Sequence, residues 1–107
     1  MEDKTVLVEL RFGADAKDSF DISVATLKDL DVEEGDKARD PSILAVLTVA
    51  AAAAKLITEL ISLAKSLKKN ANKREILVVK LDDHNQEKSI YLLEATDDEL
   101  RSFVSGD

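Results

Sequence analysis

The sequence predicts an α+β fold in which two β-hairpins, each followed by a short helix, surround one long central apolar helix. Three observations support this prediction. Apolar and polar residues alternate before residue 40, as in strands with one buried face, and a short apolar run typical of a strand covered on both faces follows residue 70. Residues 40–70 are rich in strong helix formers. The two flanks also resemble one another at one fixed spacing. We expect a four-stranded antiparallel or mixed sheet.

The N-terminal flank alternates twice. Residues 5–12 predict a half-buried strand, and residues 19–24 predict a second strand that completes a β-hairpin. The inward positions of the first strand are Val6, Val8, Leu10 and Phe12. Residues 25–30 then predict a short helix with Thr26 as its N-cap, and residues 31–39 an acidic connector.

The central segment, residues 40–70, is predicted to be one helix whose two halves differ. Asp40 is a suitable N-cap, because its carboxylate can accept the free amide protons of the first turn. From Leu56 onward, leucines recur at helical spacing, which is typical of a helix with one buried face. Between Ile43 and Ala54 the only polar side chain is Thr48, so this half must be covered all round. The cover is the rest of the domain, a second copy or lipid.

The length of this predicted helix favours a second copy. Residues 41–69 would span about 43 Å as a straight helix, against a diameter of about 34 Å for a compact chain of this size. The alternatives are a kinked core helix and a membrane segment, although a bilayer core of about 30 Å exceeds the apolar run. We expect alanines to let two such helices approach closely in a homo-oligomer. The predicted interface consists of Val46, Val49, Ala50, Ala53, Ala54, Ile57 and Leu60.

The C-terminal flank predicts a second hairpin and a capped helix. Residues 75–81 form a strand that we place centrally in the sheet, since four consecutive apolar residues indicate cover on both faces. Residues 88–93 form its hairpin partner. Thr96 and Glu99 match a capping box that opens a short helix. The apolar side of that helix carries Leu100, Phe103 and Val104.

The self-similarity of the two flanks predicts a ββα repeat. An offset of 70 residues aligns the chain from Val6 to Leu30 with the chain from Ile76 to Leu100 without a gap, with six identical residues. We therefore expect one domain over residues 1–107. Its parts are a first ββα unit at 5–39, the central helix at 40–70 and a second ββα unit at 74–105.

Charge is unevenly distributed along the chain. The net charge is −7, yet residues 41–74 contain one acidic and six basic side chains. Five of these basic residues form a candidate electrostatic cluster: Lys65, Lys68, Lys69, Lys73 and Arg74. Such a run can contact nucleic acid or anionic lipid. We favour a solvated helix end that faces the acidic flanks of this chain or of a second copy, because nucleic-acid-binding domains are usually basic.

The sequence contains no catalytic or metal-binding constellation that we recognise. It has no cysteine and a single histidine, His84, in a polar loop, which is too few ligands for a zinc site. Phosphate-binding glycine loops and nucleophile elbows are absent as well. We predict no enzyme activity, no cofactor and no metal. The charged start of the chain, Met1 to Lys4, lacks the pattern of a signal peptide, so we expect a cytoplasmic protein.

Residues 41–103 resemble a known family. The segments S-I-L-A-V-L-T-V-A-A-A-A-A-K-L-I-T-E-L-I-S-L-A-K-S-L, R-E-I-L-V-V-K-L-D-D and K-S-I-Y-L-L-E-A-T-D-D-E-L are similar to the effector-associated constant component of bacterial conflict systems. The resemblance implies a small adaptor that brings effector and sensor proteins together without catalysis. We therefore predict a protein–protein interaction module that self-associates or docks a partner through the long helix. The alternative is a membrane-peripheral protein that uses this helix and the basic cluster.

Overall fold

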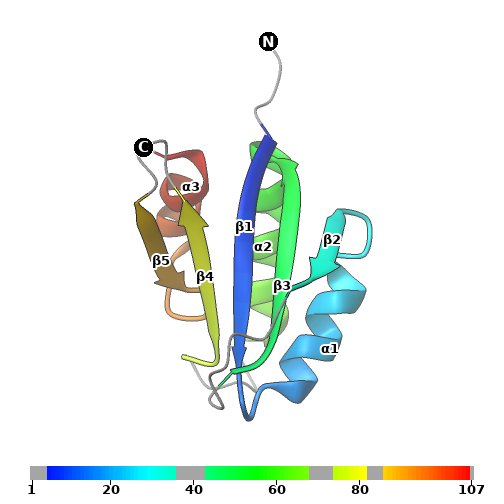
Figure 1. Cartoon of the computed structure of the whole chain (residues 1–107). Coiled ribbons are helices and arrows are strands. Elements are labelled where there is room, and N and C mark those ends of the chain that lie inside the picture. Colours follow the sequence, from blue (N-terminus) through cyan, green and yellow to red (C-terminus); the bar gives the residue numbers. More distant parts are fainter. Residues whose placement is uncertain (1–4, 36–42, 68–73, 82–85, 107) are drawn as a thin grey trace.

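One antiparallel sheet of five strands, in the order β2-β3-β1-β4-β5, organises the chain. This computed structural model describes residues 5–35, 43–67, 74–81 and 86–106. The elements are β1 (Thr5–Gly13), α1 (Lys17–Thr26), β2 (Asp31–Glu34), β3 (Ile43–Ala52), α2 (Ala53–Leu67), β4 (Ile76–Leu81), β5 (Glu87–Tyr91) and α3 (Asp97–Ser105). The three helices of the described residues lie on one face of the sheet, and Figure 1 looks onto the other face. The α+β class was predicted, but the predicted layout of four strands around a long helix is wrong.

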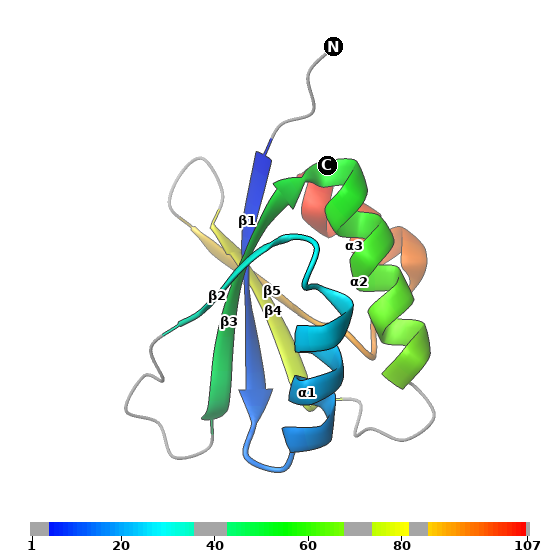
Figure 2. The same cartoon turned by 90° about the vertical axis from the view of Figure 1, so that its right-hand side faces the viewer.

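The long central helix does not exist, because its apolar half is strand β3. This half contains β-branched Ile43, Val46, Thr48 and Val49, which favour strands. Strand β3 pairs with β1 along its whole length and with β2 on its other side. The chain turns after Ala52, so that α2 runs back across the sheet (Figure 2). The predicted N-cap, Asp40, lies outside the described residues.

The amphipathic half of the predicted helix is confirmed as α2. Its leucine stripe is buried against the inner face of the sheet. The members of the stripe are Leu56, Leu60, Leu63 and Leu67. They pack with inward residues of β1 and β3 into one core cluster. This core needs no second copy, because the domain itself covers the leucines.

The first predicted hairpin is wrong, because residues 17–26 form helix α1. The buried positions of α1 and of the residues that flank it recur at helical spacing: Ala16, Ser19, Ser23 and Leu27. Two of these buried residues are serines, which a hydrophobic pattern does not mark. The strand prediction was based instead on alternating apolar residues, of which Ile22 and Val24 are 41 % and 42 % exposed. Inside the helix, Ser23 Oγ donates to the Ser19 carbonyl oxygen at 2.7 Å.

The ββα repeat is also wrong, since only the second unit has that order. The first unit is a strand, a helix and a further strand. Thr26 closes α1 instead of opening a helix, and the predicted acidic connector contains strand β2. The second hairpin, β4 and β5, and helix α3 are confirmed. Strand β4 lies between β1 and β5, as its apolar sequence predicted.

Helix α3 begins with the predicted capping box. The Glu99 backbone N–H donates to Thr96 Oγ1 at 3.1 Å, and the Thr96 N–H donates to Glu99 Oε1 at 3.0 Å. Both bonds satisfy amides that the helix leaves without an internal partner. At its other end, Gly106 has a φ of 82°, the left-handed conformation that glycine adopts without strain.

We expect Thr96→Ala to lower the free energy of unfolding by about 1 kcal/mol, because the Glu99 amide loses its acceptor. Thr96→Ser keeps the hydroxyl and serves as the matched control. Urea denaturation at a fixed protein concentration measures both variants. Equal losses in the two variants would show that the hydroxyl is not what stabilises α3.

Candidate interaction surface

The face of the sheet opposite the helices, here called the helix-free face, carries alternate residues of every strand. Its central members are Leu7, Glu9, Arg11, Val46, Thr48, Ala50, Leu77 and Val79. The register sets them in rows: Glu9 lies between Thr48 and Val79. The next row places Arg11 between Val46 and Leu77. The centre of this face is therefore largely apolar.

An ion-pair network shields part of the helix-free face. Arg11 Nε donates to Glu9 Oε1 at 3.2 Å, and Arg11 Nη2 lies 3.5 Å from Glu87 Oε1. Val79 lies one row from both Arg11 and Glu87, on the diagonal that joins them. The ion pair therefore crosses the sheet at Val79, which is only 4 % exposed. Leu7 lies beyond this network and is 58 % exposed. Leu7 is therefore an accessible large apolar side chain on this face.

Strand β5 forms one edge of the sheet (Figure 1). The Leu92 N–H donates to the Ile76 carbonyl oxygen at 3.1 Å, which fixes the alternation of the β4–β5 ladder. In that alternation Lys88 and Ile90 direct their backbone groups at β4. The backbone N–H and C=O groups of Ser89, Glu87 and Tyr91 point away from β4, along the plane of the sheet. The Tyr91 carbonyl oxygen accepts from the amides of Glu94 and Ala95.

A groove runs along this edge between β5 and α3. It has a volume of about 610 Å³. Its lining residues are Lys88, Ser89 and Ile90 of β5, Asp98, Glu99, Ser102 and Phe103 of α3, and Gly106. Lys88 is exposed, and the carboxylates belong to the first turn of α3. The β5–α3 groove thus combines a strand edge that no described strand pairs with and side chains of both charges.

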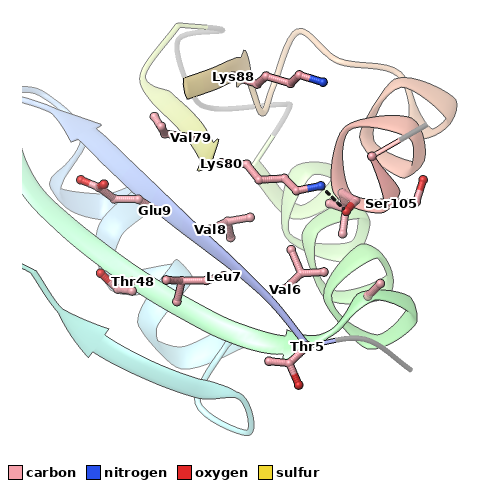
Figure 3. Close-up of a pocket in the computed structure, with 13 residues that line it drawn as sticks. Thr5, Val6, Leu7, Val8, Glu9, Thr48, Val79, Lys80, Lys88 and Ser105 are labelled. Carbon is pink, nitrogen blue, oxygen red and sulfur yellow. Dashed lines mark hydrogen bonds between the residues drawn. The ribbon is translucent and has the colours of Figure 1, made fainter. Parts of the chain in front are cut away.

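A crevice of about 570 Å³ lies where β1 and β4 separate beside the end of α3 (Figure 3). Its floor includes Val6 and Val8 of β1. Lys80 Nζ donates to the carbonyl oxygens of Phe103 at 3.2 Å and Val104 at 2.8 Å. These bonds satisfy free carbonyls at the negative end of the helix dipole. Lys80 therefore ties β4 to α3 instead of presenting a free ammonium to a substrate.

The described residues hold no group of three or more histidine, cysteine or acidic side chains arranged to bind a metal. His84, in the predicted polar loop, lies outside the described residues. The charged residues that line the crevice are Glu9, Lys80 and Lys88. Glu9 is bonded to Arg11 and Lys80 to α3. The features that remain are the helix-free face, which offers a docking surface, and the β5 edge, which offers backbone hydrogen bonds.

The seven predicted interface residues do not share one face, because they are divided between a strand and a helix. Val46 and Ala50 lie on the helix-free face, whereas Val49 lies on the inner face and is fully buried. Leu60 is fully buried in the core beneath the sheet. The other three residues belong to α2, as Leu60 does. Ala53 and Ile57 are half-buried, and Ala54 is exposed.

Two of the five predicted electrostatic residues meet carboxylates of the C-terminal third of the chain. Lys65 Nζ lies 4.0 Å from Asp97 Oδ2, and Arg74 Nε donates to Glu94 Oε1 at 3.1 Å. The hydrogen bond to Glu94, together with the charge of that carboxylate, raises the pKa of the exposed Arg74 guanidinium. Arg74 also lies over the ring of Tyr91, 5.6 Å from its centroid. Lys68, Lys69 and Lys73 lie outside the described residues.

The sequence interpretation missed the helix-free face and the β5 edge. One signal was present: Leu7 is apolar at a position that the alternation of β1 directs away from the core. The sheet edge had no signal of its own, because strand order depends on pairings between distant segments. Figure 1 shows β5 beside β4, outside the centre that β3, β1 and β4 form.

No family model, curated protein or solved structure matches this chain. Within the described residues, none of the helices has the length and apolar character needed to cross a bilayer.

Proposed function

We propose that this chain is a non-catalytic protein–protein interaction module that self-associates. The observation that supports the proposal is a sheet with all its described helices on one face. The other face exposes Leu7, and strand β5 leaves backbone donors and acceptors at the edge. An open strand edge can pair with a strand of another chain, and it is the main support for this proposal.

An adaptor role is the form of this function that we propose. The resemblance of residues 41–103 to the effector-associated constant component implies a module that brings other proteins together. A self-associating domain does this by raising the local concentration of whatever is linked to it. The proposed location is the cytoplasm.

The membrane-peripheral alternative depended on a single apolar helix. Strand β3 takes the place of the apolar half of that helix. Lys65 and Arg74, two members of the basic cluster, contact carboxylates of the same chain. We therefore propose only the interaction module.

The mass of the protein in solution tests self-association. We expect sedimentation equilibrium at high micromolar concentration to give a mass of twice the 11.7 kDa chain, falling toward the chain mass on dilution. A mass of 11.7 kDa at every concentration would contradict the proposal. Leu7→Glu, measured in the same way, reports whether the helix-free face contributes to the contact.

A further inference from the structure

We propose that two copies pair through strand β5, antiparallel and about a two-fold axis at Ser89, to form one continuous sheet of ten strands. The inference rests on the proposed self-association and names the surface that performs it. The partner is a second copy of this chain. Three features of the β5 edge support it: the direction of its backbone groups, the charges that each register would oppose, and the charges on the two faces beside it.

The backbone geometry of β5 provides the hydrogen bonds. Glu87, Ser89 and Tyr91 direct their backbone groups away from β4. With the axis at Ser89, the two Ser89 residues face one another, and each donates its N–H to the carbonyl oxygen of the other. Glu87 then faces Tyr91 of the second copy, and the Glu87 backbone carbonyl oxygen accepts from the Tyr91 N–H. The Tyr91 carbonyl oxygen already accepts within its own chain, so we expect four bonds across the axis.

The sequence of β5 disfavours the two registers toward the start of the strand, and its length disfavours an axis at Ile90, which would pair only Ser89, Ile90 and Tyr91 within the strand. Moving the axis to Lys88 would oppose the two Lys88 side chains, and moving it to Glu87 would oppose two carboxylates. With the axis at Ser89 all five residues of the strand are paired, and no like charges lie directly opposite. The two Lys88 side chains become diagonal neighbours, about 7–8 Å apart instead of the about 5 Å of a direct pair.

Charges on the helix side of the sheet complement one another in this register. Lys88 faces Ile90 of the second copy, and Ile90 lines the β5–α3 groove together with Asp98 and Glu99. The exposed Lys88 ammonium of each copy therefore approaches two carboxylates of the other. Both grooves are filled in this way, because the axis relates them.

Charges on the helix-free face are complementary as well. Glu87 faces Tyr91 of the second copy, and the guanidinium of Arg74 lies over the Tyr91 ring. The Glu87 carboxylate thus approaches an arginine of the other copy that already donates to Glu94. Long-range attraction of this kind favours the correct encounter of two surfaces.

The opposite edge of the sheet, strand β2, cannot pair with itself in this way. Its sequence is D-V-E-E, and Asp31 and Glu33 lie on the same face. Every antiparallel register of two β2 strands therefore sets carboxylates opposite carboxylates, which is destabilising. One self-complementary edge and one self-repelling edge give a closed dimer instead of an open fibre.

The decisive experiment replaces Ser89 by proline. The Ser89 N–H points away from β4, so the ring removes bonds across the axis and leaves the β4–β5 ladder its donors. Val32→Pro is the matched control. The Gly35 N–H donates to the Val46 carbonyl oxygen, an alternation that directs the Val32 N–H away from β3. Both variants thus carry proline at an outward position of an edge strand.

We expect Ser89→Pro to raise the dimer dissociation constant about tenfold or more, because both central bonds are lost. Val32→Pro should leave that constant within about twofold of wild type. Sedimentation velocity measures it, and thermal unfolding shows that each variant is folded. A folded Ser89→Pro protein that dimerises like wild type would overturn the pairing while leaving self-association intact. A monomeric wild-type protein would overturn both proposals.

Ser89→Cys tests the same axis without relying on proline. The chain has no other cysteine, so any disulfide formed must join two copies. Directly opposed residues of a bonded antiparallel pair have Cα atoms about 5.5 Å apart, within the range of disulfides. We expect mild oxidation to link Ser89→Cys at least about tenfold faster than Glu33→Cys, an exposed position on β2. Equal rates would contradict an axis at Ser89. Loss of dimer in Leu7→Glu but not in Ser89→Pro would assign the contact to the helix-free face.

Discussion

Val49→Lys is expected to abolish folding. Val49 is fully buried on the inner face of β3, where it belongs to the core cluster formed with the leucines of α2. A lysine there would bury an unpaired ammonium, at an effective cost of several kcal/mol even after local relaxation. A domain of this size has a total stability of about 5–15 kcal/mol, so this substitution removes most or all of it.

Thr48→Lys, one residue earlier, is the control. Thr48 lies on the helix-free face, paired with Glu9 of β1 and Glu33 of β2, so a lysine gains two neighbouring carboxylates. We expect this variant to fold with a melting temperature close to that of wild type. Circular dichroism during heating measures both variants. Tolerance of lysine at position 49 but not at 48 would show that β3 does not direct Val49 into the core and Thr48 away from it.

Phe12→Ala is expected to lower the free energy of unfolding by about 3–5 kcal/mol, because a buried aromatic side chain leaves a cavity. Phe12 is fully buried, and its ring meets that of Phe20 edge-to-face with centroids 5.3 Å apart. Phe20 belongs to α1, so the cavity also weakens the contact of this helix with the sheet.

Leu7→Ala is the matched control for Phe12→Ala. Leu7 belongs to the same strand but is mostly exposed, and we expect a loss of no more than about 0.5 kcal/mol. Denaturant titrations at one fixed protein concentration are required, because association also stabilises the folded state. A loss at Phe12 no larger than that at Leu7 would place Phe12 outside the core. In the Phe12/Phe20 double variant we expect a coupling of about 0.5–1.5 kcal/mol from the ring pair.

Local sequence patterns correctly predicted the elements whose hydrophobic periodicity matches the way the folded protein buries them. Strand β1 was predicted because it alternates cleanly between an apolar inner face and a mostly polar outer face. Strand β4 was predicted from its apolar run, and α2 from its leucine stripe. The capping box at Thr96 was predicted because it involves residues only three apart, and both of its hydrogen bonds are present.

Residues 43–52 show where local patterns fail. An apolar run of this length fits a buried strand and a buried helix equally well by periodicity. Its alanines favour a helix and its β-branched residues a strand. The tertiary structure decided for a strand, because only an extended segment can pair with β1 and β2 at once. That pairing satisfies the backbone on both sides and leaves the leucines of α2 to cover one face.

The sequence by itself determined the α+β class, the second hairpin and the capped C-terminal helix. It also shows that the chain has no cysteine and one histidine. The tertiary structure alone decided that α1 is a helix, since its buried face includes two serines that no hydropathy pattern marks. It alone decided the strand order, and with it which strand lies at the edge. The candidate interaction surface follows from that order, because a strand exposes its backbone groups only where no distant segment of the chain pairs with them.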